Sequence, residues 1–225
     1  MFLAIDLLTP GEAAAMAARL ETAAWADGRL TAGYQSALAK RNRQLPANDP
    51  AARALGREVL AALGRSLLFQ SAALPAAIFP PLFNRYDAGD RFGTHVDNAI
   101  REAHDGRRIR TDLSATLFLS PPESYDGGAL LVEDGSGSRA FRLPAGQLLL
   151  YPATTLHSVE PVSRGTRLAS FFWVQSLVAD AGRRAILFDI DIAIQNLRPR
   201  VGDSDPALVA LTGAYHNLLR QWAAP

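Results

Sequence analysis

The middle of the chain, residues 76–176, consists of short apolar runs with strand-like alternation, separated by turn residues. This pattern restricts the region to an antiparallel β architecture. Asp134-Gly-Ser-Gly137, between two such runs, is typical of a hairpin turn. A longer series predicts one face of a single strand: Ile109, Thr111, Leu113, Ala115, Leu117 and Leu119. About eight strands of this kind predict a double-stranded β-helix, or jelly roll.

Helix signals come before the predicted sheet. Thr9-Pro-Gly-Glu12 supplies an N-cap, a proline at the first helical position and the Glu of a capping box, and predicts a helix to about Ala24. Asp49-Pro50 opens a second helix in the same way. Residues 25–48, between these helices, are expected to be irregular.

Helix signals also follow the sheet. The alternation stops after Gln175, and the sequence predicts a helix from Asp180 to about Leu197. A final amphipathic helix begins at Asp205-Pro206, and its apolar stripe is expected to pack on the N-terminal helices or on a second subunit. We therefore expect an α+β protein. Its jelly-roll core and N-terminal helices would form a domain over residues 1–176, with a C-terminal helical extension, 177–225, packed on it.

Composition excludes several classes of protein. The 225 residues are 48% hydrophobic, which is ample for one core, and the net charge of +1 gives no electrostatic case for nucleic acid or an anionic membrane. Without cysteine there is no disulfide framework, zinc-thiolate site or cysteine nucleophile. The N-terminal apolar run lacks a basic region and contains Asp6, so we expect no signal peptide and a cytoplasmic location. No apolar run reaches membrane-spanning length.

Three residues in the β-rich region have the types and spacing of a metal centre. His95 and Asp97 stand two apart, and His157 follows about 60 residues later. Residues i and i+2 of a strand point to the same face, so the first two can bind one ion together. Two imidazoles and one carboxylate are the facial triad of non-haem Fe(II) oxygenases, which leaves coordination positions open.

Arg167, ten residues after His157, adds the cation that a dicarboxylic cosubstrate would need. The run Gly146–Tyr151 predicts a strand leading to His157, and Arg167–Val174 predicts the next one. Ser163-Arg-Gly-Thr166 has turn composition. We therefore expect His157 and Arg167 on adjacent antiparallel strands, in contact with opposite ends of one small ligand.

Other interpretations use the same residues differently. One is a jelly-roll module that binds or senses iron without oxygenase activity, although a bare metal site has no use for Arg167. Another is a zinc hydrolase, although no acidic residue stands out as a general base. A purely structural jelly roll would have both histidines in its core. His104, in a polar loop, is expected to be solvated, and His216, on the last helix, to be structural.

Further stretches carry a family resemblance: Asp27-Gly-Arg-Leu-Thr-Ala-Gly33, Lys40-Arg-Asn-Arg-Gln-Leu45, Asn84-Arg-Tyr-Asp-Ala-Gly-Asp90 and Tyr215-His-Asn-Leu-Leu-Arg-Gln-Trp222. With the triad, they resemble the bacterial PKHD-type hydroxylases, Fe(II)/2-oxoglutarate dioxygenases related to prolyl 4-hydroxylase. The resemblance covers nearly the whole chain.

The resemblance implies that His95, Asp97 and His157 hold Fe(II), and that Arg167 binds the distal carboxylate of 2-oxoglutarate. Tyr86 is a candidate second donor to that carboxylate, with a buried core tyrosine as the alternative. A substrate would be hydroxylated with release of succinate and carbon dioxide, and ascorbate is a candidate additional cofactor.

The substrate is left open between a peptide and a small molecule, including a siderophore, since the resembling group is associated with iron acquisition. Residues 98–108, directly after the metal strand, are hypothesised to cover the substrate. The helical regions are a candidate surface for homo-oligomer formation.

Overall fold

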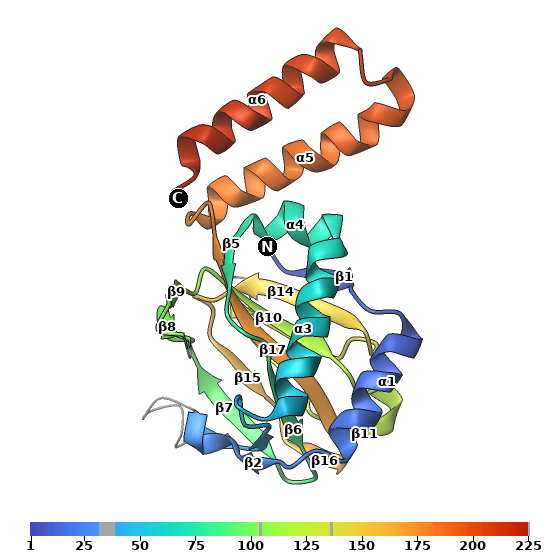
Figure 1. The fold of residues 1–225 in the computed structure, drawn as a ribbon, viewed down its shortest axis with the longest axis vertical. Coiled ribbons are helices and arrows are strands. Elements are labelled where there is room, and N and C mark those ends of the chain that lie inside the picture. Colours follow the sequence, from blue (N-terminus) through green and yellow to red (C-terminus); the bar gives the residue numbers. More distant parts are fainter. Residues whose placement is uncertain (32–38, 104, 136, 225) are drawn as a thin grey trace.

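The computed structural model describes residues 1–31, 39–103, 105–135 and 137–224, which form a two-sheet sandwich with helices on one side (Figure 1). The larger sheet has eight strands in the order β1-β14-β10-β17-β6-β4-β2, with β5 also paired to β17. Its strands are β1 (Leu3–Asp6), β2 (Ala26–Asp27), β4 (Arg43–Gln44), β5 (Pro75–Ile78), β6 (Leu82–Tyr86), β10 (Leu113–Phe118), β14 (Gln147–Pro152) and β17 (Arg167–Ser176).

The smaller sheet has five strands in the order β13-β12-β15-β7-β3. They are β3 (Lys40–Arg41), β7 (Arg91–His95), β12 (Leu130–Asp134), β13 (Gly137–Phe141) and β15 (His157–Val159). Two further antiparallel pairs join β8 (Ile100–Glu102) to β9 (Arg108–Arg110) and β11 (Tyr125–Gly127) to β16 (Val162–Gly165). Pairing is antiparallel throughout these strands, which confirms the predicted jelly-roll architecture and the hairpin around residues 134–137.

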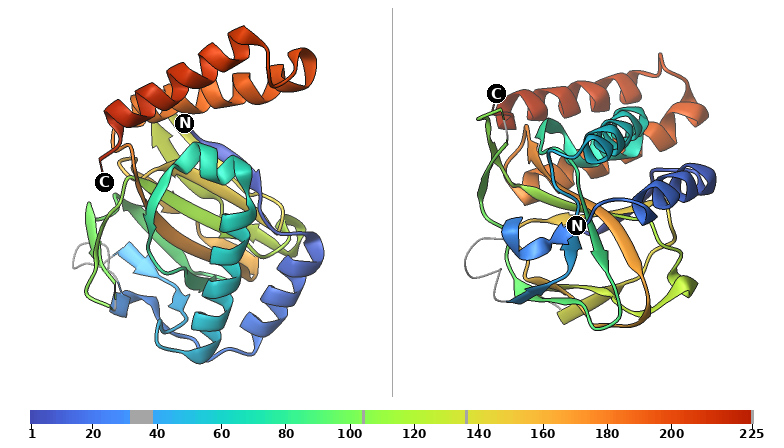
Figure 2. Two further views of the ribbon diagram at one scale, coloured as in Figure 1. Left: turned by 45° about the horizontal axis from the view of Figure 1, so that its top comes forward. Right: turned by 60° about the horizontal axis from the view of Figure 1, so that its bottom comes forward.

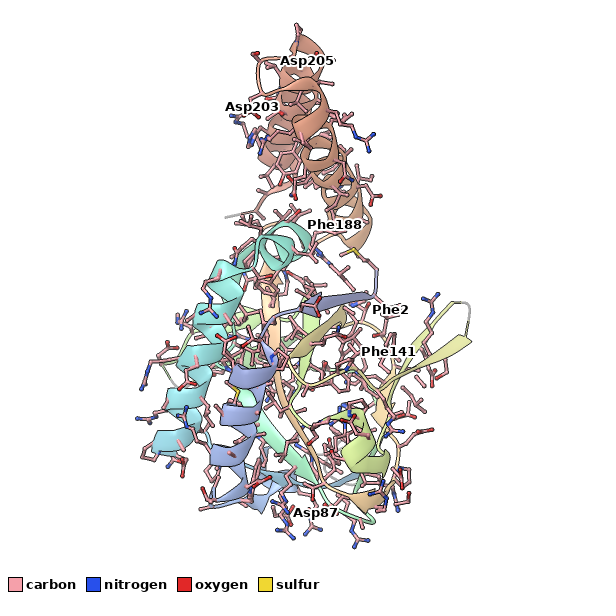
Figure 3. The ribbon with its side chains drawn as sticks, turned by 90° about the vertical axis from the view of Figure 1, so that its right-hand side faces the viewer. Phe2, Asp87, Phe141, Phe188, Asp203 and Asp205 are labelled. Atoms are coloured by element: carbon pink, nitrogen blue, oxygen red, sulfur yellow. The ribbon has the colours of Figure 1, made fainter. Side chains whose placement is uncertain are left out.

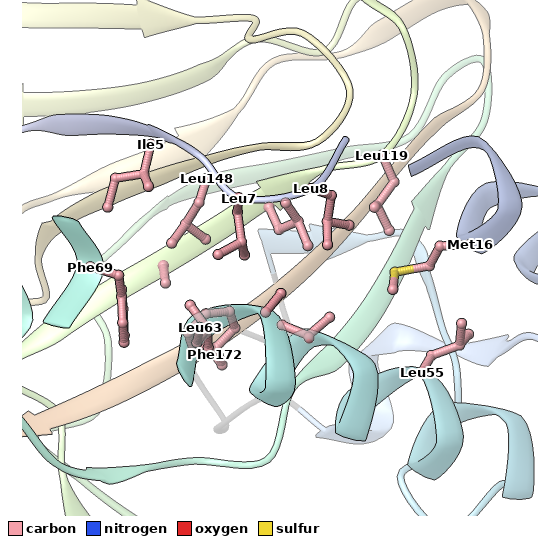
Figure 4. Close-up of a cluster of buried hydrophobic side chains, with 14 of the residues drawn as sticks. Ile5, Leu7, Leu8, Met16, Leu55, Leu63, Phe69, Leu119, Leu148 and Phe172 are labelled. Atoms are coloured by element: carbon pink, nitrogen blue, oxygen red, sulfur yellow. The ribbon is translucent and has the colours of Figure 1, made fainter. Parts of the chain in front are cut away.

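Three helices cover the outer face of the larger sheet: α1 (Pro10–Glu21), α3 (Pro50–Arg65) and α4 (Leu67–Ala73) (Figures 1 and 2). Their buried side chains, such as Leu63 and Phe69, join Leu148 and Phe172 of the sheet in the main core (Figure 4). Because strand residues alternate between faces, Phe172 points to this core while Phe171 and Trp173 point to the space between the sheets.

The N-terminal helices begin where predicted. Thr9 and Glu12 form both hydrogen bonds of the capping box, and Asp49 caps α3. Residues 25–48 are less irregular than expected, because they contain β2, β3, β4 and a short 3-10 helix, Gly28–Thr31. Each of these strands has only two residues, which is too short for alternation to signal.

The single strand predicted over residues 109–119 is wrong. The chain forms β9 and then β10, and Ile109 packs near Trp173 while Leu113 belongs to the main core. Asp112 lies between the two strands, where its carboxylate accepts hydrogen bonds from Arg110 and from the backbone N–H of Ser176. These hydrogen bonds stabilise the break between β9 and β10, which the alternation of apolar side chains does not predict.

The C-terminal helices α5 (Ala181–Val201) and α6 (Pro206–Trp222) form an antiparallel hairpin that projects from the sandwich (Figures 1 and 3). Phe188 lies at its base against the main core, whereas Asp203 and Asp205 lie at its tip (Figure 3). α5 contacts α4, and α6 packs mainly on α5. The apolar stripe of the last helix therefore packs mainly on α5 and not on the N-terminal helices as expected, and it is α5 that contacts α4. No helix in the described part of the chain is long and apolar enough to cross a membrane.

Candidate active site

His95, Asp97 and His157 converge between the two sheets. One ligand atom from each residue lies within 4.8 Å of the others, and these three are a group of described residues able to hold a metal ion. His95 ends β7 and pairs directly with His157 of β15. Asp97 lies two residues past the end of β7, and its Oδ2 is 3.6 Å from Nε2 of His157. The predicted triad therefore comes together in space.

Backbone contacts orient both imidazoles. Nδ1 of His95 lies 2.9 Å from the carbonyl oxygen of Gly93, and Nδ1 of His157 lies 3.1 Å from that of Thr155. A carbonyl oxygen only accepts, so each Nδ1 carries the proton and donates it. Each Nε2 then presents a lone pair, which is the form of histidine that binds a metal.

The surroundings keep His95 uncharged. Burial, with a smaller contribution from repulsion by His157, lowers the pKa of His95 to about 4. The ring of Phe92 stacks on that of His95, with 3.8 Å between centroids. A neutral imidazole at neutral pH can bind a cation without first losing a proton.

Ser114, a residue that the sequence analysis did not single out, holds the carboxylate of the triad. Its hydroxyl on β10 donates a 2.6 Å hydrogen bond to Oδ2 of Asp97. This bond links the segment after β7 to the facing sheet. A buried serine on a strand face is common, so its type alone gave no functional signal.

Arg167 lines the same cavity from β17 and is 1% exposed. Its Nε, Nη1 and Nη2 have no hydrogen-bond partner among the described residues. The guanidinium carbon lies 5.4 Å from the ring centre of Tyr86 and 5.2 Å from that of Phe118. A buried cation without a partner is strongly unfavourable, so this arrangement fits an anionic ligand.

Tyr86 also lines the cavity and pairs with Arg167 in the strand register of β6 and β17. Burial raises the pKa of Tyr86 to about 12, so its hydroxyl stays protonated and able to donate. It is 1% exposed and belongs to a cluster of buried apolar side chains. The position suits both the donor role and the core role that the sequence left open.

Gly128 is a second residue that the sequence analysis missed. Its backbone has φ +62°, and a Cβ there would lie 2.9 Å from Val162 and 3.3 Å from Cδ of Arg167. Glycine is therefore required both by the backbone angle and by the closely packed Arg167 stem. Two consecutive glycines directly before an apolar run, at 127 and 128, were the available signal.

The expected adjacency of His157 and Arg167 is wrong. β15 belongs to the smaller sheet and β17 to the larger one. The intervening residues are not a hairpin turn, because β16 pairs with β11 while the chain crosses between sheets. Both side chains still line one cavity from opposite sheets, so the inferred shared ligand does not depend on adjacency.

In the segment after the triad strand, β8 and β9 pair with each other, and Arg101 of β8 lines the cavity. Whether residues 98–108 cover a substrate stays a prediction. His104 lies outside the described residues. His216 is exposed on α6, with its ring against that of Tyr215.

Comparison with family models gives two matches. Residues 81–175 match the 2OG-Fe(II) oxygenase superfamily, and residues 181–224 match the PKHD-type hydroxylase C-terminal domain. The first match contains the triad and Arg167.

Among solved structures, a Pseudomonas putida prolyl-4-hydroxylase aligns with a TM-score of 0.51 at 21% identity, covering 78% of this chain and 92% of its own. A Trichoplax adhaerens prolyl hydroxylase, solved with a hypoxia inducible factor peptide fragment, gives 0.54 at 15% identity, covering 82% and 86%. HygX from Streptomyces hygroscopicus, solved with nickel and 2-oxoglutarate, gives 0.51 at 19%, covering 78% and 82%. At these identities the likeness shows the shared jelly-roll fold.

Curated relatives are much more similar. A PKHD-type hydroxylase of Phenylobacterium zucineum is 57% identical, with 97% of this chain and 96% of the relative aligned. One of Burkholderia thailandensis is 60% identical, with 91% and 90% aligned. The chain belongs to the PKHD-type hydroxylases within the 2OG-Fe(II) oxygenase superfamily, and it is an Fe(II)- and 2-oxoglutarate-dependent dioxygenase.

Proposed function

We propose that His95, Asp97 and His157 hold the ferrous ion of this dioxygenase and that Arg167 binds the distal carboxylate of 2-oxoglutarate. The observation that carries the proposal is the buried guanidinium of Arg167, which has no partner on any nitrogen among the described residues. A carboxylate would satisfy it through two parallel charge-assisted hydrogen bonds.

Iron and 2-oxoglutarate, when bound, supply oxygen activation that couples decarboxylation to succinate and carbon dioxide with hydroxylation of a substrate. The protein's own residues hold and orient these groups. Gly93 and Thr155 fix the imidazole tautomers, and Ser114 fixes Asp97. The aromatic ring of Phe92 shields His95 from water.

Tyr86 is proposed as a second donor to the distal carboxylate. Its support is the register pairing with Arg167 and a hydroxyl that burial keeps protonated. Replacing Tyr86 with Phe should weaken 2-oxoglutarate binding without affecting metal affinity. Equal cosubstrate affinity in Tyr86→Phe would assign Tyr86 to the core instead. Ascorbate is a candidate additive for restoring oxidised iron, which a turnover assay with and without it tests.

Metal affinity tests the triad directly. Isothermal titration of the metal-free protein with Co(II) should give one site per chain, lost in His95→Ala, Asp97→Ala and His157→Ala. His216→Ala, which removes an exposed imidazole from α6, is the matched control and should bind as the parent does. Full Co(II) affinity in the triad variants would refute the assignment. The iron-binding module that lacks oxygenase activity is disfavoured, because it gives Arg167 no ligand.

The division into a catalytic domain, 1–176, and a helical extension, 177–225, is also proposed. It is supported by two separate family models, whose boundary falls between residues 175 and 181. The substrate is proposed to be a small molecule or a peptide. A cytoplasmic location is part of the proposal, since ferrous iron and 2-oxoglutarate are both available in that reducing compartment.

Self-association through the helical regions is proposed from exposed apolar side chains on three helices. Leu67 of α4 is 77% exposed, Ile186 of α5 is 49% exposed and Val209 of α6 is 57% exposed. Light scattering coupled to gel filtration should report a dimer that Leu67→Ser or Val209→Ser weakens. A monomer at all concentrations would exclude it.

A further inference from the structure

We propose that Lys40 and Arg101 form a second anion site in the active-site cavity, which holds a carboxylate of the substrate. The inference rests on the proposed function, because it takes the metal at the triad and 2-oxoglutarate at Arg167. The substrate is then a small molecule or peptide with a carboxylate near the carbon to be hydroxylated.

Lys40 enters the cavity from β3, at the edge of the smaller sheet, and is 6% exposed. It is the single lysine among 23 basic residues of the chain. Its Nζ donates to Oε1 of Gln44 at 3.0 Å and lies 5.4 Å from the ring centre of Phe92. Phe92 also stacks on His95, so the ammonium and this proposed metal ligand lie near the same aromatic ring.

Arg101 enters the same cavity from β8. Its guanidinium carbon lies 3.9 Å from the ring centre of Trp173, in a cation–π contact. The buried Nε has no hydrogen-bond partner among the described residues. Asp97 attracts this cation electrostatically, but among the described residues the two side chains form no hydrogen bond or ion pair, and Asp97 is itself a proposed metal ligand. The fork of donors is therefore available to a ligand.

Two neighbouring rings bring these cations together. Phe171 and Trp173 lie on the same face of β17, and their ring centres are 5.7 Å apart. Lys40 Nζ lies 5.8 Å from the centre of Phe171, and Arg101 lies over Trp173. Burial, together with a smaller contribution from repulsion by Arg101, lowers the pKa of Lys40 to about 8. An anion between the two groups would relieve this repulsion.

The pair is separate from the cosubstrate cation. Arg167 lies on the same face of β17 but four residues before Phe171, about 13 Å away along an extended strand. The metal ligands lie beside the Lys40–Arg101 pair, since Ser114, which bonds Asp97, is opposite Trp173 in the register. One carboxylate cannot reach both Arg167 and Arg101. An anion held by the pair would therefore place the rest of its molecule next to the metal.

The test uses two probes of equal size in protein loaded with Fe(II) and 2-oxoglutarate under nitrogen. N-acetylprolinate carries a carboxylate, and N-acetylprolinamide is its neutral counterpart. We expect calorimetry to show the carboxylate binding about tenfold or more tightly than the amide. Saturating 2-oxoglutarate should not displace it. Equal affinity of the two probes, or competition with 2-oxoglutarate, would overturn the inference without involving any variant.

Variants then locate the site. Arg101→Gln and Lys40→Gln should each remove most of the preference for the carboxylate while the charge-transfer absorption of the iron–2-oxoglutarate chelate persists. Arg108→Gln is the matched control, because it removes the same charge from an exposed position on the same hairpin, and it should keep the preference. A preference that survives in both test variants would overturn the inference. Absence of the chelate band in the parent would instead refute the proposed function.

Discussion

Ser114 donates a 2.6 Å hydrogen bond from its hydroxyl to the carboxylate of Asp97, and the two residues belong to opposite halves of the sandwich. Asp97 follows the end of β7 in the smaller sheet, and Ser114 lies within β10 of the larger one. Asp97, the triad residue that lies outside a strand, is thus held in place by a residue of the facing sheet. The separation of the two sheets and the geometry of the metal ligands are therefore linked.

Replacing Ser114 with Ala should reduce metal affinity, because Asp97 would lose the donor that fixes its rotamer. Removal of such supporting bonds reduces metal affinity by about tenfold or more. Co(II) titration of Ser114→Ala measures the effect. Ser158→Ala, on β15 beside His157, serves as the control. Unchanged affinity in Ser114→Ala would mean that the strand end alone holds Asp97.

Arg167→Met should separate stability from cosubstrate binding. In the metal-free protein it removes a buried cation that has no partner among the described residues, so the free energy of unfolding should stay the same or rise by ~1 kcal/mol. Affinity for 2-oxoglutarate should fall by about a hundredfold. Urea unfolding and calorimetry measure the two quantities. Arg164→Met, on the exposed strand β16, should leave cosubstrate binding intact. A destabilised Arg167→Met with normal 2-oxoglutarate affinity would contradict this account.

Gly128→Ala should affect both stability and the cosubstrate site. An alanine at φ +62° is strained by about 1 kcal/mol or more, and its Cβ would press on Val162 and the Arg167 stem. We expect a lower melting temperature and weaker 2-oxoglutarate binding. Gly135→Ala is a suitable comparison, because nothing lies within 4 Å of a Cβ at that position. Equal melting temperatures and equal 2-oxoglutarate affinities in the two variants would show that the Arg167 side chain tolerates displacement by a Cβ at position 128.

The metal-free protein should lose stability as the pH falls through the range in which His95 resists protonation. Its pKa is lowered from 6.5 to about 4 by burial, so between these values the unfolded chain binds more protons than the folded one. The free energy of unfolding should therefore decrease from about pH 6.5 towards pH 4. Urea unfolding at several pH values should give a shallower dependence for His95→Gln than for the parent. An identical dependence in both would show that other groups cause it.

The His95–Asp97 pair and the starts of the N-terminal helices could be predicted from the sequence, because both depend on short-range geometry. His95 and Asp97 are two residues apart along the chain, and Thr9 and Asp49 cap helices within their own first turns. The alternation of side chains along the strand also predicted that Arg167 and Phe171 lie on one face of β17, and both line the cavity.

The relation between the sheets could not be predicted, because alternation gives the face of a strand but not its partner. β16 pairs with β11 and carries the chain from one sheet to the other, so His157 and Arg167 meet across the sandwich. Ser114 and Gly128 act through contacts with residues far along the chain. Their types are common in strands and turns, and only the folded structure reveals their partners.

The most direct test of the central claim is an anaerobic titration with Fe(II), with and without 2-oxoglutarate, followed by visible absorption. The account predicts a weak metal-to-ligand charge-transfer band that requires both additions, disappears in His157→Ala and fades in Arg167→Ala. A band of full strength in both variants, or its absence from the parent with iron bound, would contradict the assignment of these residues.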